Sequence, residues 1–324
     1  MPAASPVLII AGPTASGKSA LALRVAEAFD GTVINADSMQ VYRELRILTA
    51  RPSPEEEARV PHRLYGCLSV TERCSAGRWM AMATAEIRAA WSQSRLPIVA
   101  GGTGLYLKAL THGLASVPDM PERAVEDARA LHGRLGGEAF RARLAELDPE
   151  STARLAAGDT QRLIRAYSVA AATGRPIGAW QRDRGRRGGA GGRWGETLDA
   201  EFVTVALMPP ASALYAVTDA RFDRMMAAGA LAEADAIRRL GLDPTLPAAR
   251  ALGVRELRGH LTGALSRDEA SAAAKRATRN FVKRQLTWLR HQMKPDRVIP
   301  RLYTDAMWPE VLVFLRESLL TERG

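Results

Sequence analysis

Residues 7–19 of the chain read VLIIAGPTASGKS, an apolar run that passes directly into a glycine-rich loop. The run Val7–Ala11 has no polar side chain, as is typical of a strand buried on both faces of a parallel sheet. Gly12–Ser19 then satisfies the pattern G-x-x-x-x-G-K-[ST], and apolar residues recur at helical spacing from Leu21 to Phe29. A buried strand, this loop and a helix in that order predict the core of a P-loop protein.

The glycine-rich loop can hold a polyphosphate. Its successive backbone N–H groups point inward, and the helix N-terminus adds a partial positive charge. Lys18 would supply a point charge to the terminal phosphate, and the Ser19 hydroxyl could ligate Mg²⁺. The pattern does not specify which polyphosphate is bound. The predicted phosphate-binding residues are Gly12, Pro13, Thr14, Ala15, Ser16, Gly17, Lys18 and Ser19.

Further strands of the sheet are predicted later in the sequence. Residues 32–35 and 97–100 read TVIN and PIVA, and a helical stretch over 81–91 leads into the latter. Residues 202–207, FVTVAL, return to strand. This β-α-β rhythm predicts an α/β fold, a P-loop NTPase-like parallel sheet flanked by helices.

Two strands of the expected sheet end in residues that can do chemistry. Asp37 follows the strand at 32–35 and should lie at the carboxyl edge of the sheet, beside the P-loop. Its carboxylate could accept a proton or hold a Mg²⁺ water, or it could merely cap the following turn. Thr103 lies in Gly101–Tyr106, where glycines let a ligand approach closely. Motor ATPases often carry an acidic residue at this strand end, so Gly and Thr favour transfer to a second substrate.

The middle of the chain differs from its two ends. We expect residues 1–116 to form the first part of the core, 117–197 a helical insertion, and 198–324 the second part of the core with C-terminal helices. The insertion ends in a Gly/Arg-rich loop, Arg182–Arg193, which is either a solvated linker or a basic loop that touches RNA.

A long helix is predicted near the C-terminus. Ser266 and Glu269 form a capping box, and the helix should reach about His291. One face of this helix carries a basic stripe, which consists of Lys275, Arg279 and Lys283. The stripe is either a solvated face or a nucleic-acid contact.

Composition narrows the class of partner. The formal net charge is +10, and only five of the 45 basic residues are lysines. Arginine recognises phosphate and guanine through two parallel hydrogen bonds, so a nucleic acid is favoured over a membrane. The two cysteines, Cys67 and Cys74, are too few for a disulfide framework or a zinc cluster and are expected to be semi-buried. No apolar run is long enough to cross a membrane, so we expect a soluble cytoplasmic protein.

Taken together, the P-loop, Asp37–Tyr42 and Gly101–Tyr106 resemble the corresponding segments of the tRNA dimethylallyltransferases (tRNA isopentenyltransferases) in order and spacing. The resemblance covers about residues 7–291. It continues in Thr49–Pro52, Pro61–His62, Asp159–Arg162, Arg221–Met225, Ala251–Arg255 and Lys283–Arg290. Leu48 stands where this family commonly has Gly, and Arg51 where Lys is usual.

The resemblance implies a reaction and roles for particular residues. Lys18, Ser19 and Arg221 would bind the diphosphate of dimethylallyl diphosphate together with Mg²⁺. Thr103 would hydrogen-bond the oxygen that bridges the dimethylallyl carbon to phosphorus. Asp37 would take a proton from the exocyclic N6 amine of the adenosine 3′ of the anticodon. The implied catalytic residues are therefore Asp37, Thr103, Lys18 and Arg221.

The resemblance also implies which residues contact tRNA. These are Asp37, Ser38, Met39, Gln40, Thr103, Gln161, Arg162, Leu163, Ile164, Arg165, Arg250 and Arg255. The expected partners are the anticodon stem-loop and dimethylallyl diphosphate, with no membrane, and the protein is expected to be a monomer. Three alternatives remain: an adenylate isopentenyltransferase that acts on free AMP or ATP, a P-loop small-molecule kinase, and a non-catalytic RNA-binding P-loop protein. The long basic helix and Gln161–Arg165 favour tRNA over the free nucleotide.

Overall fold

The computed structural model describes residues 5–115, 117–182 and 198–319. The chain divides into two compact units: Met1–Thr111 with Leu198–Gly324, and His112–Thr197. The first unit contains the sheet and the P-loop, whereas the second is helical. The predicted insertion began at residue 117, five residues after the start of the second unit.

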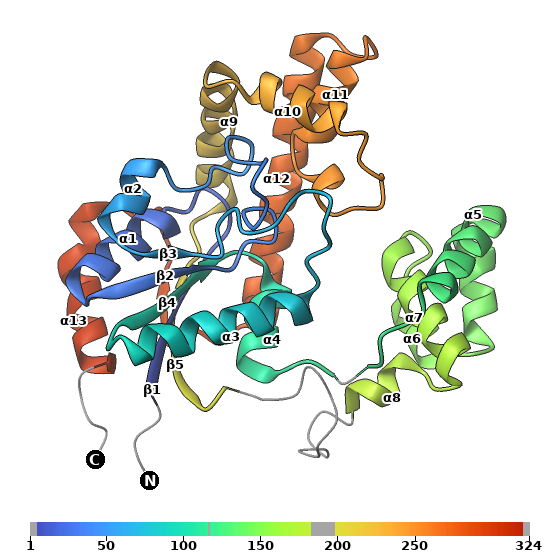
Figure 1. Ribbon diagram of the computed structural model, residues 1–324, viewed down its shortest axis with the longest axis horizontal. Helices are drawn as coiled ribbons and strands as arrows, with labels where there is room; N and C mark the ends of the chain where they lie inside the picture. Colours follow the sequence, from blue (N-terminus) through green and yellow to red (C-terminus); the bar gives the residue numbers. More distant parts are fainter. Residues whose placement is uncertain (1–4, 116, 183–197, 320–324) are drawn as a thin grey trace. The chain divides into compact units, whose positions relative to one another are not determined.

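The first unit is built on a six-stranded parallel sheet with the strand order β3-β2-β4-β1-β5-β6 (Figure 1). The strands are β1 (Ser5–Ala11), β2 (Gly31–Asn35), β3 (His62–Arg63), β4 (Leu96–Gly101), β5 (Ala200–Leu207) and β6 (Arg297–Ile299). The central strand β1 pairs with β4 and β5, with Ile10 opposite Ala100 on one side and Val205 on the other. This arrangement confirms the predicted α/β fold.

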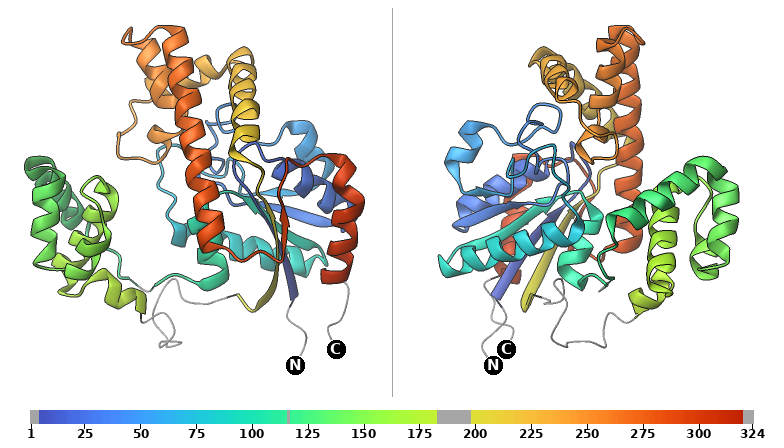
Figure 2. Two further views of the ribbon diagram at one scale, coloured as in Figure 1. Left: turned by 180° about the vertical axis from the view of Figure 1, so that it is seen from behind. Right: turned by 45° about the vertical axis from the view of Figure 1, so that its right-hand side comes forward.

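Helices cover both faces of this sheet because the crossovers run one way along it from β1 to β3 and the other way from β3 to β6. Helices α1 (Lys18–Ala28) and α13 (Trp308–Leu319) share one apolar core with the strands. The crossover from β2 to β4 contains α2 (Pro54–Arg59) and α3 (Ala76–Ser92), and β4 leads into α4 (Gly104–His112). Helix α3 packs on β2 and β4 (Figure 2). The indole of Trp79 in this helix donates to the Asn35 carbonyl at 2.8 Å.

A second group of helices in this unit follows β5. It comprises α9 (Ala211–Ala227), α10 (Ala230–Arg239), the 3₁₀ turn η2 (Ala248–Arg250), α11 (Val254–Leu261) and α12 (Arg267–Gln292). A further 3₁₀ turn, η3 (Asp305–Met307), leads into α13. Helix α12 packs along α9 and α11, and Figure 2 shows its full length. The Ser266 side chain accepts from the Glu269 N–H, so the predicted capping box of this helix is confirmed.

The described part of the second unit contains the helices α5 (Glu122–Ala145), α6 (Pro149–Arg154), α7 (Thr160–Thr173) and α8 (Ile177–Arg182). Its core includes Phe140, Leu144 and Leu163, all without solvent exposure. The buried carboxylate of Asp148 caps α6, because Oδ1 accepts from the Ser151 N–H at 2.9 Å. This unit therefore has an apolar core of its own.

Several expectations from the sequence need correction. The short edge strands β3 and β6 were not predicted, since two or three residues carry no alternation signal. Cys67 is exposed rather than semi-buried, while Cys74 is partly buried and both thiols are free. The loop Arg182–Arg193 lies outside the described residues except for Arg182. No helix among the described residues is both long and apolar enough to cross a membrane.

The basic stripe on α12 is not a fully solvated face, because two of its residues form ion pairs. Lys275 pairs with Asp223 at 2.6 Å, and Arg279 forms an ion pair with Asp219; both acids lie on α9. These two residues join α12 to α9, while Lys283 is exposed. Two of the three stripe residues thus have partners within the fold.

Candidate active site

The P-loop connects β1 to α1 in a conformation that its sequence allows. Gly17 has a φ of +92°, a left-handed conformation that a residue without Cβ adopts without strain. A Cβ at this position would also lie 2.8 Å from the Cβ of Tyr303. The Tyr303 N–H donates to the Ser16 carbonyl at 3.1 Å, so the segment after β6 supports the loop from behind.

Lys18 begins α1 and lies within electrostatic reach of two other predicted catalytic residues. Burial lowers its pKa from 10.5 to about 8; the Asp37 carboxylate opposes this shift, and the Arg221 guanidinium adds to it. Burial likewise lowers the pKa of Arg221, and Asp37 again opposes the shift. The fold therefore brings Lys18, Asp37 and Arg221 together, from three elements distant in sequence. Two cations against one carboxylate leave this place suited to an anion.

Asp37 is held firmly at the end of β2. The Asn35 side chain accepts from the Asp37 N–H at 2.8 Å and donates to the Asp37 carbonyl at 3.0 Å. One carboxylate oxygen of Asp37, Oδ1, accepts from the Met39 N–H at 2.9 Å. Among the described residues, none hydrogen-bonds the other oxygen. Asp37 thus caps the turn and still has an oxygen able to accept a proton, so the two interpretations of this residue are compatible.

Thr103 lies directly beside the segment that follows β2. Its hydroxyl oxygen accepts from the Ser38 N–H at 2.9 Å, and its own N–H donates to the Ala36 carbonyl at 3.2 Å. The Gly12 N–H donates to the Gly101 carbonyl at 3.3 Å, which joins the P-loop to the same strand end. The carboxyl ends of β1, β2 and β4 therefore present the P-loop, Asp37 and Thr103 at one edge of the sheet.

Gln285, on α12, is a site residue that the sequence did not single out. Its side-chain oxygen accepts from the Thr14 N–H at 2.9 Å, and its amide nitrogen donates to the Gly102 carbonyl at 3.0 Å. Only 5% of Gln285 is exposed. A Cβ at position 102 would lie 2.3 Å from this amide, which explains the glycine. Gln285 fixes the spacing between the P-loop and the loop that carries Thr103.

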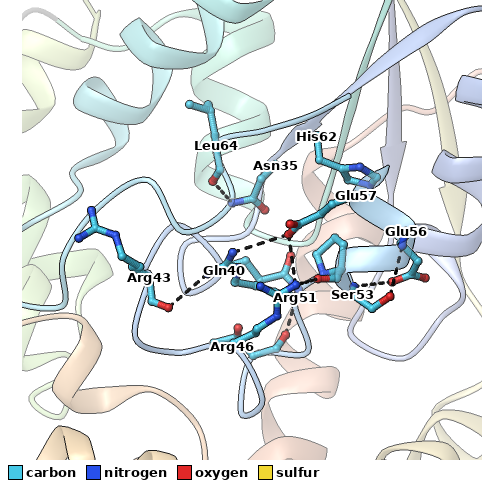
Figure 3. A network of polar contacts seen from close by, with 12 residues as sticks. Asn35, Gln40, Arg43, Arg46, Arg51, Ser53, Glu56, Glu57, His62 and Leu64 are labelled. Carbon is cyan, nitrogen blue, oxygen red and sulfur yellow. Dashed lines mark hydrogen bonds and ion pairs between the residues drawn. The ribbon is translucent and has the colours of Figure 1, made fainter. Parts of the chain in front are cut away.

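Gln40 and Arg221 converge on one loop. The Gln40 amide nitrogen donates to the carbonyls of Thr49 at 2.9 Å and Ala50 at 3.0 Å. Arg221, on α9, donates to the same Ala50 carbonyl at 3.5 Å. Figure 3 shows the neighbourhood of Gln40 in this loop, including Arg51, whose guanidinium lies 3.7 Å from a Glu57 oxygen. The predicted contact residues Ser38, Met39 and Gln40 thus lie in one segment that hydrogen bonds to neighbouring loops hold in place.

The remaining predicted tRNA contacts lie elsewhere. Arg250 and Arg255 are exposed and line a pocket of about 890 Å³ formed by α10, η2 and α11. In the second unit, Gln161, Arg162 and Arg165 are exposed on α7, and Ile164 is partly buried. Leu163 is fully buried in the core of that unit, so its predicted tRNA contact is corrected to a packing role.

The donor set bears on the expected Mg²⁺. No group of three or more His, Cys, Asp or Glu side chains in the described residues could hold a metal by itself. The Ser19 hydroxyl is exposed at the start of α1. Mg²⁺ usually takes one or two protein ligands and completes its shell with phosphate oxygens and waters. The residues present therefore fit an ion that arrives with a phosphate ligand.

Comparisons with known proteins agree on one family. The family model described as IPP transferase matches residues 40–292. A tRNA dimethylallyltransferase of Rhodospirillum centenum is 55% identical over 297 residues, 92% of each chain. One from Paramagnetospirillum magneticum is 47% identical over 98% of each chain.

Solved structures are similar over most of the chain. The tRNA isopentenylpyrophosphate transferase of Bacillus halodurans matches with a TM-score of 0.69 and 28% identity, over 98% of this chain and 97% of that one. A eukaryotic dimethylallyltransferase acting on tRNA matches with a TM-score of 0.79 over 99% of this chain and 80% of that one. At 22% identity, the second likeness supports the fold alone.

Proposed function

Because the chain belongs to the IPP transferase family, we propose that it transfers a dimethylallyl group from dimethylallyl diphosphate to tRNA. The acceptor is the exocyclic N6 of the adenosine 3′ of the anticodon, and diphosphate is released. The observation that carries this proposal is the meeting of the P-loop, Asp37 and Thr103 at the carboxyl ends of β1, β2 and β4, with the charges of Lys18 and Arg221 acting on the same place. Cations bind a leaving diphosphate, and a carboxylate accepts a proton. A prenyl transfer to an amine needs both.

The P-loop backbone, Lys18 and Arg221 would hold the donor's diphosphate and stabilise the negative charge that develops as the allylic C–O bond breaks. The Thr103 hydroxyl would donate to the bridging oxygen of the diphosphate. Mg²⁺, bound through Ser19 and the diphosphate, would supply further charge neutralisation. Because the positive charges are already in place, little reorganisation is required when the bond breaks.

The acceptor amine requires a base. The lone pair of the adenosine N6 is delocalised into the ring, so the amine attacks well only if a proton leaves as the new C–N bond forms. Asp37 has a carboxylate oxygen with no hydrogen bond from a described residue, and its other oxygen fixes its orientation. To reach this edge of the sheet, the adenine of the acceptor nucleotide must leave the anticodon stack.

The tRNA would contact the predicted residues of both units other than Leu163, and the formal net charge of +10 suits a polyanionic partner. We propose that a monomer carries out this transfer in the cytoplasm, where tRNA is found. Neither alternative activity, on a free nucleotide or as a kinase, has a specific feature of the site in its favour.

The experiment that tests this function is a transfer assay with radiolabelled dimethylallyl diphosphate and an anticodon stem-loop. Label should appear in the RNA with wild-type protein, and Lys18→Ala should reduce turnover roughly 10²-fold or more. Transfer to free AMP at the same rate, or phosphate transfer from ATP at a comparable rate, would refute the tRNA assignment.

Asp37→Asn tests the base. The amide keeps an oxygen that can accept from the Met39 N–H, so the turn should survive. Without a negative charge, kcat should fall roughly 10²-fold or more with donor affinity little changed. Single-turnover rates near those of the wild type would return Asp37 to a purely structural role.

A further inference from the structure

The carboxylate of Glu233, on α10, accepts three backbone hydrogen bonds from one loop. Its Oε2 accepts from the N–H groups of Arg46 at 2.9 Å and Ile47 at 2.7 Å, and Oε1 accepts from Leu48 at 2.9 Å. Successive N–H groups that converge in this way form an anion-binding nest. Here the anion is a side chain of the same chain, more than 180 residues away in sequence.

The loop that Glu233 holds is also closed on itself. The Ala50 N–H donates to the Ile47 carbonyl at 2.9 Å, and the Arg51 N–H donates to the Arg46 carbonyl at 3.1 Å. Ala50 has a φ of +48°, a left-handed conformation that a non-glycine residue adopts only when its surroundings impose it. Fixing residues 46–48 therefore fixes the direction of the carbonyls at 49 and 50.

Those two carbonyls accept the hydrogen bonds of the Gln40 side chain, three residues after Asp37. Resting on the proposed function, we propose that Glu233 is a positioning residue for the acceptor tRNA. It holds the loop 46–50, and the Thr49 and Ala50 carbonyls then fix Gln40 in the segment that receives the target adenosine. The donor's diphosphate is held by the P-loop, so Glu233 acts chiefly on the acceptor.

Packing connects the same loop to the helices beside it. Leu48 is 7% exposed, and a Cβ at Gly253 would lie 2.8 Å from its side chain, so the loop touches the start of α11. Ile47 lies 3.7 Å from the position of a Cβ on Gly229, which caps α10. Glu233 thus links the predicted tRNA-contact residues around Gln40 with α10 and α11, the helices before and after Arg250.

The test substitution is Glu233→Gln, because an amide has the same shape but only one acceptor oxygen. Its NH₂ group would face a backbone N–H, and a donor that faces a donor cannot form a hydrogen bond. The matched control is Asp235→Asn on the same helix. Among the described residues, Asp235 forms ion pairs with Arg238 and Arg239 of its own helix, at 2.7 and 2.6 Å, and has no hydrogen bond or ion pair with the loop.

Two measurements follow for these variants. Amide hydrogen exchange at residues 46–48 should be about tenfold faster in Glu233→Gln and unchanged in Asp235→Asn. The kcat/KM for tRNA should fall about tenfold in Glu233→Gln, while the dissociation constant for dimethylallyl diphosphate stays within about twofold. Thermal melts ensure that every assay is run on folded protein. Should Glu233→Gln not fold, Glu233→Asp, which keeps the charge but is shorter, replaces it with the same expectations.

A double-mutant cycle with Gln40→Ala isolates the positioning role. If Glu233 acts through Gln40, the loss in kcat/KM for Glu233→Gln in the Gln40→Ala background should be less than about threefold. Full additivity, or an equal loss of donor affinity, would overturn the inference. So would faster exchange with normal activity on tRNA. If the wild-type protein did not prenylate tRNA at all, the proposed function would fail instead, which the exchange measurement tells apart.

Discussion

At the scale of single residues, the site depends on a lysine whose charge is costly. Lys18 lies among the P-loop backbone and near Arg221, and its ammonium nitrogen donates to the Pro13 carbonyl at 3.4 Å. Burial lowers its pKa to about 8, below the 10.5 of an ordinary lysine. Between these two values the unfolded chain binds a proton that the folded chain does not, so the penalty that the buried Lys18 imposes on folding falls as the pH rises through that window.

The lowered pKa of Lys18 makes donor binding depend on pH. A bound diphosphate favours the protonated lysine, so binding takes up a proton once the pH exceeds about 8. We expect the dissociation constant for dimethylallyl diphosphate to rise about tenfold between pH 7 and pH 9. Calorimetric titrations across this range measure it, and in Lys18→Ala the rise should be largely lost. A wild-type affinity that does not vary with pH would contradict the assigned pKa.

At the scale of elements, α12 is more important to the site than its exposed basic residues suggest. Its N-terminal half pairs with α9 through Lys275 and Arg279, and its C-terminal half carries Gln285 into the core of the site. Trp288, one turn later, fills the space beside Gly104, where a Cβ would lie 2.2 Å from its ring. One helix therefore holds the P-loop and the Thr103 loop at a fixed separation.

Replacing Gln285 by Leu should both destabilise the fold and slow the reaction. The change leaves the partly buried Thr14 N–H and the buried Gly102 carbonyl without their partner, and an unpaired buried polar group costs about 1–3 kcal/mol. We expect the melting temperature to fall by several degrees and turnover to drop about tenfold. Thr287→Val, at an exposed position of the same helix, should change neither. Unchanged turnover in Gln285→Leu would show that the reaction does not depend on the exact separation of the P-loop and the Thr103 loop.

At the scale of the whole molecule, charge decides how tRNA is bound. Each arginine that contacts a phosphate displaces counterions, so affinity should fall steeply with salt. Arg162→Ala should make the plot of log K for tRNA binding against log salt concentration less steep by about one, and should leave donor binding unchanged. Arg316→Ala, an exposed arginine on α13, serves as the control and should keep the wild-type slope. Equal slopes for both variants would remove Arg162 from the tRNA contact.

The sequence alone determined the parts of this protein that depend on local structure. The P-loop, the capping box at Ser266 and the positions of the long strands along the chain each follow from neighbouring residues whose backbone geometry is set within one turn or one strand. Asp37 could be placed at the sheet edge for the same reason, because parallel strands end on a common side.

Only the tertiary structure decided which distant groups meet. Gln285 reaches Thr14 across 271 positions, and Glu233 reaches Leu48 across 185. The pairing of Arg279 with Asp219, the burial of Leu163 and the two short edge strands were equally hidden. A polar side chain that bonds a distant backbone leaves no periodic signal, because its partner is a peptide group that every residue carries.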